Sequence, residues 1–537
     1  MVCFRPPRPG FSEKTLLTHF VVALPLVLLL LGAGFLALGR WIRSRWQWVL
    51  AVSVSLGAWL AILVGWRSVP ATLALSAWRP EDVFLDRVQL MLDPVGWPIQ
   101  LAAVSVLLAG LLAEPARKGE RRSGEWAGTL ALAAAGLAAI QAGNLLTVAI
   151  TWAILDVTGW AIPALSASSE PARERWVLNS AGVLLVLAAV IGLPEGGLGR
   201  GLSSLGSNPL AAGLVLAGAG LRLGSNWRGP ASSDGAAAQG AQHVLRQVLP
   251  PAACLAALGR VLGIAEGPLV PWAAALGAVS CLAGSLAWVN ASDDSASVAG
   301  LALGLAGIAG LSGAAFGGPV AFVWSACGVL FLVIGALSFV WRPFAKAYRL
   351  APRWGALALV GLPFTSGALP AGALAGGGQS VVGWIAGFIG LAGLSVMALG
   401  LWRRAEMAAE SWPTLERLPR ASHVSGVLIL LVTLTLTYVP LRSGAGSSIG
   451  MLGTGIALAL LISAIFIRSR WHWAARPRGA RAARWLDPAP ILRVLGAPYH
   501  LLMQAVDRLA DLLEGEAAVL WIYVIVLALS LAAGLGR

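Results

Sequence analysis

Long apolar runs separated by short polar segments are the main pattern along this chain. The runs Leu16–Gly39 and Trp48–Trp66 are each long enough to cross a bilayer, which takes about 20 residues. No small-residue cleavage site follows the first run, so we interpret it as a membrane span and not as a removable signal peptide. The pattern therefore predicts an all-α polytopic membrane protein.

Division of the chain at charged and Gly/Pro-rich breaks predicts about 16 transmembrane helices. The predicted spans are 16–39, 46–66, 96–114, 125–142, 144–168, 176–194, 208–225, 241–263, 268–289, 297–315, 319–341, 355–375, 379–402, 423–441, 446–467 and 516–535.

Basic residues alternate between the two sides of the membrane that this division implies. Odd-numbered loops hold most of the arginines, for example those at 40–45 and 117–122, whereas the second loop (67–95) is balanced by four acids, Glu81, Asp82, Asp86 and Asp93. Because Lys and Arg favour cytoplasmic loops, we expect the odd loops in the cytoplasm and both termini outside. The expected location is the cell inner (plasma) membrane.

Composition supports the membrane assignment. Only 12% of the residues are charged, the mean hydropathy is +0.79, and many of the 24 tryptophans lie near the ends of apolar runs. The net charge of +14 comes from arginines in the short loops, so we expect no nucleic-acid partner. The four cysteines are scattered and predict neither a metal site nor a disulfide framework.

One segment near the C-terminus has a different pattern. Residues 468–515 begin with a basic stretch and continue with leucines at helical spacing opposite Asp507, Asp511 and Glu514. This pattern is typical of an amphipathic helix on the membrane surface, and a linker packed on the protein's own loops fits it equally well.

Two predicted helices are interrupted by Gly and Pro, at Gly218–Pro230 and at Leu359–Gly372. Broken helices at corresponding places indicate two inverted repeats whose unwound backbone lines a polar path. We predict the following division: helices 1–3 (1–124, with the extracytoplasmic loop 67–95), a first five-helix repeat (125–263), a second repeat (268–402), two helices (403–467), the basic linker and surface helix (468–515) and a last span (516–537).

An ordered set of short motifs resembles the antiporter-like, proton-conducting membrane subunits of respiratory complex I, membrane-bound hydrogenases and multisubunit sodium/proton antiporters. "LALVGLPFTSG" is similar to the family's Gly-(Leu/Ile)-Pro-x-x-(Ser/Ala)-Gly motif, in which Gly361, Pro363 and Gly367 stand here. Other matches are "NLLTVAITW" (144–152), "LRLGSNW" (221–227), "GVLFLVIGA" (328–336) and "LADLLEGEAAVLW" (509–521). The resemblance implies a fold that moves protons through buried Glu, Lys and His residues.

This chain departs from the family at most of the proton-carrying positions that the resemblance implies. Ala153 stands at the glutamate of the fifth helix, Arg222 at the lysine of the first broken helix, Arg246 at a histidine, Cys327 at a lysine and Ala371 at a lysine or glutamate. A guanidinium keeps its proton in proteins, because its pKa is above roughly 12. The scaffold is therefore expected to survive with a degenerate proton path.

The remaining candidates for an ion path are Asp156, Arg222, Arg246 and His243. Asp156 follows Ala153 by three residues, so it could present a carboxylate to the same cavity one turn deeper.

Three roles are open for Asp156: an ion pair with Arg222, a local hydrogen bond to Thr151 or Thr158, and a working proton acceptor. Arg246 and Arg260 lie near helix ends, from which their side chains can reach the membrane interface, and His243 fits a helix-end histidine better than a relay.

We therefore expect a subunit of an ion-translocating complex that resembles complex I or a hydrogenase, with other integral membrane subunits and the lipid bilayer as partners. Its role is structural or coupling, it needs no cofactor, and it has no catalytic activity of its own. Two alternatives stay open: a subunit of an inorganic-carbon uptake assembly, and a membrane enzyme acting on a lipid-linked substrate through Glu81, Asp82 and Asp86.

Overall fold

The computed structural model of the chain describes residues 13–39, 43–75, 87–116, 123–164, 171–189, 201–225, 240–263, 269–291, 294–316, 320–341, 349–376, 380–406, 417–445 and 452–474. The chain divides into two units, Met1–His472 and Trp473–Arg537. Of the second unit only residues 473 and 474 are described, so the architecture below is that of the first.

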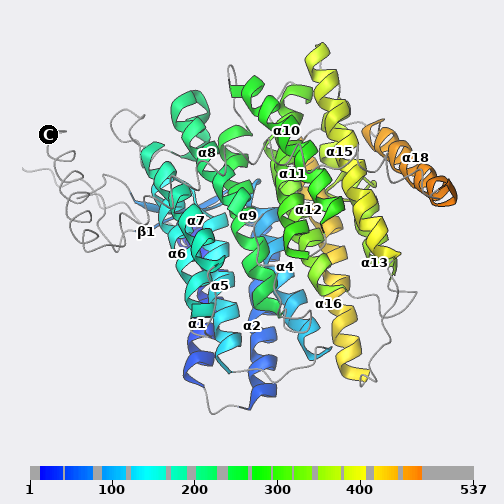
Figure 1. Cartoon of the computed structure of the whole chain (residues 1–537). Coiled ribbons are helices and arrows are strands. Elements are labelled where there is room, and N and C mark those ends of the chain that lie inside the picture. The colour runs from blue at the N-terminus through cyan, green and yellow to red at the C-terminus, as the bar shows by residue number, and fades with distance from the viewer. Residues whose placement is uncertain are drawn as a thin grey trace, which may run out of the picture. The chain divides into compact units, whose positions relative to one another are not determined.

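The described residues form helices joined by short segments, with one β-hairpin (Figure 1). The longer helices are α1 (Glu13–Leu38), α2 (Ser44–Gly65), α4 (Gly96–Ala113), α5 (Ser123–Ile140), α6 (Leu145–Ala164), α7 (Pro171–Ala188), α8 (Pro209–Ser225), α9 (Ala241–Leu262), α10 (Leu269–Asn290), α11 (Asp294–Phe316), α12 (Ala321–Val340), α15 (Val381–Ala405), α16 (Arg417–Leu436) and α18 (Leu452–Ala474). The shorter elements are α13 (Leu350–Leu359), α14 (Ala368–Ala375), α17 (Tyr438–Ala445), η1 (Trp66–Ser68), η2 (Glu114–Ala116), η5 (Leu202–Ser207) and the strands β1 (Ala71–Leu75) and β2 (Val88–Leu92).

Each helix predicted before residue 468 is present in the described part of the chain. Eight of these helices are long and apolar enough to cross a membrane. The protein is thus a multi-pass, largely helical membrane protein, as its hydropathy predicts. The predicted last span, 516–535, and the surface helix lie outside the described residues, while the first residues of the predicted basic linker continue α18 to Ala474.

Three helices, α4, α9 and α12, form the centre of the bundle. Nearly every side chain of each is buried, because neighbouring helices pack against them all round. α4 and α12 are apolar on nearly all sides, whereas α9 also carries polar and charged residues, among them His243, Arg246 and Arg260. Peripheral helices instead carry exposed apolar side chains, among them Leu31 on α1, Trp272 on α10 and Phe388 on α15. Such stripes are what a bilayer or a neighbouring membrane subunit covers.

α10 and α11 cross at very close range. Glycines from both helices meet there, and a Cβ at Gly284 would overlap the backbone of Gly304, while one at Gly307 would overlap that of Cys281. Small residues let helix backbones approach closely in a membrane, where van der Waals packing and not the hydrophobic effect drives association.

The second predicted break is confirmed. α13 ends at Leu359 and α14 begins at Ala368, and the turn between them contains Gly361 at φ +90° and Phe364 at φ +64°. A Cβ at Gly367 would overlap the carbonyl oxygen of Ala358, so the third residue of the Gly-Pro-Gly motif must also lack a side chain. Thr454 of α18 donates a hydrogen bond to the Gly361 carbonyl at 2.7 Å and holds the turn in place.

The span predicted at 423–441 lies within one apolar span, Arg417–Ser443, which a turn at Thr437 divides into α16 and α17. Pro440 lacks the N–H that a continuous helix needs, which explains an interruption here. The Leu434 carbonyl near the break accepts a hydrogen bond from Ser366 N at 2.9 Å. The two discontinuities therefore lie against each other.

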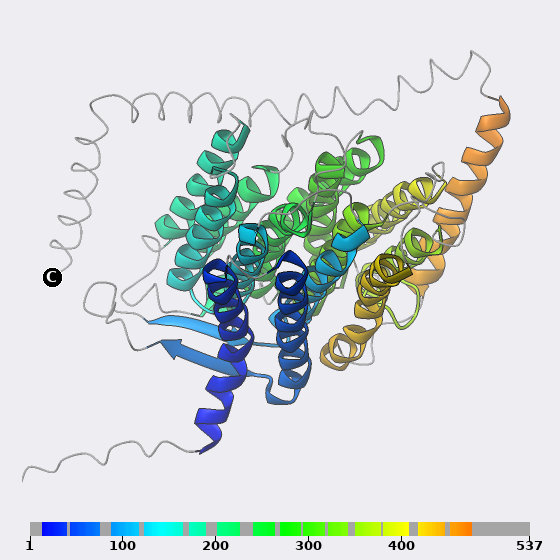
Figure 2. The ribbon, with the colours of Figure 1, turned by 90° about the horizontal axis from the view of Figure 1, so that it is seen from below.

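The loop predicted at 67–95 contains a hairpin that the hydropathy did not reveal. β1 and β2 pair antiparallel, with Ala71 opposite Leu92 and Leu75 opposite Val88, and lie beside α1 in Figure 2. β2 also exchanges backbone hydrogen bonds with residues 141 and 143 at the end of α5. Glu81, Asp82 and Asp86, on which the lipid-linked enzyme alternative depends, lie outside the described residues.

The first predicted break is only partly within the described residues. α8 is continuous through Arg222 to Ser225, and residues 226–239 are not described. The inverted relation between the two repeats therefore stays a prediction. The C-terminal end of α1, the N-terminal end of α2 and the lower ends of α4 and α16 lie at one end of the bundle (Figure 1), which is the end predicted to face the cytoplasm.

Candidate ion-path site

A buried ion pair joins α6 and α8. Arg222 Nη1 lies 2.6 Å from Asp156 Oδ2, and Arg222 Nη2 lies 2.7 Å from Asp156 Oδ1. The two side chains are 0% and 5% exposed. This geometry is the bidentate fork that a guanidinium and a carboxylate form when both are ionised, so the predicted pairing is present.

A third helix completes the pair. Asn179 of α7 donates from Nδ2 to Asp156 Oδ1 at 3.2 Å, and its backbone carbonyl accepts from Arg222 Nη1 at 3.1 Å. The guanidinium also lies over the Trp152 ring, 4.6 Å from its centroid, and beside the Cys254 thiol of α9. These contacts offset part of the cost of burying two charges, which for one charge at mid-membrane is at least roughly 2.5–3.5 kcal/mol.

Local sequence explains how the two helices present these residues. Asn144 caps α6, because its Oδ1 accepts from Thr147 N at 2.9 Å, and its Nδ2 donates to the Arg87 carbonyl beside the hairpin. Asn208 caps α8 in the same way, through Ala211 N at 3.1 Å, and Pro209 follows at the first helical position.

The expectation that Asp156 shares a face with Ala153 is wrong. Ala153 is exposed, whereas Asp156 is buried on the same inner face as Trp152, four residues earlier. Residues three apart differ by about 60° around a helix, and here the edge of the buried stripe falls between them. The predicted alternative, a hydrogen bond from Asp156 to Thr151 or Thr158, is not observed. The hydroxyl groups of these two threonines donate instead to backbone carbonyls of α6.

Two glycines make room for the arginine. An ideal Cβ at Gly182 of α7 would lie 2.8 Å from both Arg222 Cγ and the Gly218 carbonyl, and one at Gly218 of α8 would lie 2.7 Å from the Gly182 carbonyl. The Arg222 stem therefore fills the space that an alanine would take. Gly218 begins the first predicted break, whereas no sequence motif indicated that Gly182 lies against Arg222.

Gly182→Ala is expected to lower the free energy of unfolding by about 1–3 kcal/mol, because the added methyl group meets backbone as well as a side chain. Denaturation in mixed detergent micelles measures this change. The matched control is Gly220→Ala in α8, where a Cβ meets nothing within 4 Å. Equal effects of the two substitutions would contradict the packing argument.

The other two candidates lie away from the pair. Both His243 and Arg246 are on α9, the helix whose Cys254 lies beside Arg222. At a rise of 1.5 Å per residue, they are about 16 and 12 Å along the helix from Cys254. His243 makes an edge-to-face contact with Phe339 of α12, with ring centroids 5.5 Å apart. Arg246 is half-buried. The structure therefore brings Asp156 and Arg222 into contact, whereas His243 and Arg246 lie apart from this pair.

Arg260 does not extend to the interface as predicted. It is buried and paired with Asp93, with Arg260 Nη2 2.7 Å from Asp93 Oδ1 and Nε 3.0 Å from Oδ2. Its Nη1 donates to the carbonyls of Ile140 and Ala142 at the end of α5, and Asp93 Oδ1 accepts from Gly96 N at the start of α4. Asp93 is thus a buried cap and not a solvated loop acid.

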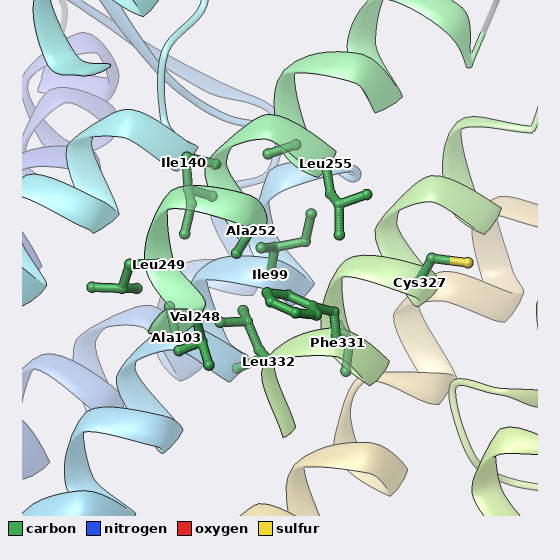
Figure 3. Packing of buried hydrophobic residues seen from close by; sticks show 14 of the residues in the cluster. Ile99, Ala103, Ile140, Val248, Leu249, Ala252, Leu255, Cys327, Phe331 and Leu332 are labelled. Carbon is green, nitrogen blue, oxygen red and sulfur yellow. The ribbon is translucent and has the colours of Figure 1, made fainter. Parts of the chain in front are cut away.

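Most of the side chains in the centre of the bundle between these groups are apolar, and a few buried polar side chains, among them Gln100 on α4 and Gln247 on α9, lie in the same helices. Figure 3 shows Ile99 of α4, Leu255 of α9 and Phe331 of α12 packed together, and Cys327 lies on the same helix as Phe331. Cys327 and Ala371, at two positions where the resembled family keeps titratable groups, are 0% exposed within this cluster. Among the described residues, no group of three His, Cys, Asp or Glu side chains could hold a metal ion.

Solved structures share this arrangement of helices. A chain of the Mrp complex from Dietzia sp. DQ12-45-1b matches 96% of this chain and 63% of its own length, at TM-score 0.67 and 14% identity. A chain of the membrane-bound sulfane sulfur reductase, an archaeal respiratory membrane complex, matches 95% and 100%, at TM-score 0.62 and 14% identity. A chain of respiratory complex I from Thermus thermophilus matches 83% and 99%, at TM-score 0.58 and 20% identity.

The chain has the antiporter-like membrane-subunit fold. This likeness confirms the family resemblance at the level of the fold, and the structural neighbours are parts of multisubunit membrane complexes. The chain spans less than two thirds of the Dietzia chain. No family model matches the sequence, and no curated protein matches it.

Proposed function

We propose that this protein is an antiporter-like subunit of a multisubunit ion-translocating membrane complex in which its own proton path is closed, so that it acts as a structural or coupling subunit. The observation that carries the proposal is the bidentate Asp156–Arg222 pair, buried near the middle of the 20-residue helix α6. A proton path needs groups that change protonation state, and a guanidinium does not.

The surroundings of the pair support a closed path. Asn179 and Arg222 donate hydrogen bonds to the two oxygens of the Asp156 carboxylate, and the Trp152 ring covers the guanidinium. Most side chains in the centre of the bundle between α4, α9 and α12 are apolar. Within the described part of the chain, the titratable groups of α9 lie apart from one another: Cys254 is beside the pair, whereas His243 and Arg246 are about 16 and 12 Å from Cys254 along the helix. A fixed pair is suited to bracing three helices against one another, which a subunit within a larger complex requires.

Proton flux into proteoliposomes tests the closed path. The purified protein and its Asp156→Asn variant are expected to conduct no faster than empty liposomes, because no side chain at the pair releases a proton. The control is Asp294→Asn, which removes a half-exposed acid paired with Arg404 at 3.2 Å. Flux in the wild type that is lost in Asp156→Asn and kept in Asp294→Asn would overturn the proposal.

Purification of the tagged protein from its native membrane in mild detergent tests the complex separately. Other polytopic membrane proteins are expected to co-purify in fixed ratio, and mass spectrometry identifies them. A monomer without membrane partners would contradict the subunit role while leaving the flux result intact. Partners that handle inorganic carbon would favour the uptake assembly over a respiratory complex.

A further inference from the structure

Two arginines at the start of α13 have no acidic partner among the described residues. Arg349 is the N-cap residue and Arg353 follows one turn later; both are half-buried. The Nε atom of each is buried and has no hydrogen-bond partner within the described part of the chain. Arg353 lies over the ring of Trp402 on α15, with 5.2 Å from its Cζ to the centroid, so at least one guanidinium is held in place.

The neighbouring arginines at this end of α15 are already occupied. Arg404 lies 3.2 Å from Asp294 and over the Trp288 ring at 4.4 Å, and Arg403 Nη1 donates to the Val289 carbonyl at 3.4 Å. These contacts assign Asp294 to Arg404. Among the described residues, Asp294 is therefore not available as a partner for Arg349 or Arg353.

A cation is poorly placed at the beginning of a helix. The N-terminus of a helix carries a partial positive charge, which favours anions and disfavours arginine. No side chain caps α13 through a hydrogen bond, so its first turn also lacks a side-chain acceptor. An external anion would pair with both guanidinium groups together.

We propose that Arg349 and Arg353 bind the phosphate of an anionic phospholipid. Trp354 is 40% exposed beside them, and Trp402 lies under Arg353; tryptophans of this kind mark the headgroup level of a bilayer. Basic pockets between membrane helices on one face bind lipid headgroups through the same chemistry. This site goes beyond the function proposed above and does not depend on whether protons are conducted.

Binding of phosphatidylglycerol to the delipidated full-length protein, followed by native mass spectrometry, tests the site. The double variant Arg349→Gln/Arg353→Gln is expected to bind phosphatidylglycerol about 10-fold more weakly than the wild type, since each arginine near the headgroup contributes to attraction. Phosphatidylcholine is expected to bind both proteins equally. The matched control is Arg417→Gln, an exposed arginine in the first turn of α16, whose affinity for phosphatidylglycerol should change less than about twofold.

Three results would overturn the proposal. The first is unchanged phosphatidylglycerol binding by the double variant. The second is an equal loss in Arg417→Gln, which would indicate a general surface charge. The third is displacement of the lipid by inorganic phosphate at millimolar concentration, which would identify a free anion as the ligand. Equal thermal unfolding of the double variant and the wild type in phosphatidylcholine micelles establishes that the double variant is folded.

Discussion

Arg222→Ala is expected to lower the free energy of unfolding by about 3–5 kcal/mol, because it leaves the Asp156 carboxylate buried and uncompensated. The Asp156 side chain is 5% exposed, and among the described residues Asn179 donates the one further side-chain hydrogen bond to it. Denaturation in mixed detergent micelles, followed by tryptophan fluorescence, measures the loss.

A double-mutant cycle separates the pair from general packing. Replacing both charges, as Asp156→Leu with Arg222→Met, is expected to be far less destabilising than Arg222→Ala alone, since buried ion pairs exchanged for apolar residues of similar volume are often neutral. If the double variant lost as much stability as the sum of the single variants, the two residues would be energetically independent. The bracing role would then be abandoned.

Gly284→Val is expected to separate α10 from α11 and to prevent the protein from accumulating in a folded form. The added side chain would overlap the backbone of Gly304, which cannot move aside as a flexible side chain can. Yield of monodisperse protein on size exclusion, together with the unfolding midpoint, measures the effect.

The matched control for this crossing is Gly213→Val in α8. A Cβ there meets nothing within 4 Å, so the same change of residue type adds no overlap at that atom. The change in helix propensity is not expected to lower the stability of this variant either, because glycine is a poorer helix former than valine. Loss of folded protein in both variants would mean that valine itself, and not the close crossing, is responsible.

Much of the helical framework can be predicted from hydropathy. Apolar runs such as Leu16–Gly39 have no alternative to a helix in a bilayer, where every backbone N–H and C=O needs an internal partner. The break at Gly361–Gly367 could also be predicted, because two glycines and a proline there do not sustain a helix. The cost of isolated charges in apolar runs made the Asp156–Arg222 pair one of three roles predicted for Asp156.

Other features depend on contacts between distant parts of the chain. Asp93 and Arg260 are 167 residues apart in the sequence. The local sequence around Asp93 does not distinguish it from a solvent-exposed loop acid, and only the packing of α9 places Arg260 beside it. The hairpin is similar, because β2 needs both β1 and the end of α5 as hydrogen-bond partners. Neither pairing leaves a periodic pattern in the sequence.

The sequence by itself determined the membrane environment, the order of the helices and the presence of two opposite charges, Asp156 and Arg222, that had to be paired or neutralised. Only the tertiary structure decided which face of α6 is buried, that Asn179 and Trp152 close around the pair, and that Gly182 makes room for it. The reason is physical: hydropathy depends on each residue's own transfer from water, whereas the rotation of a helix about its axis depends on side chains contributed by other helices.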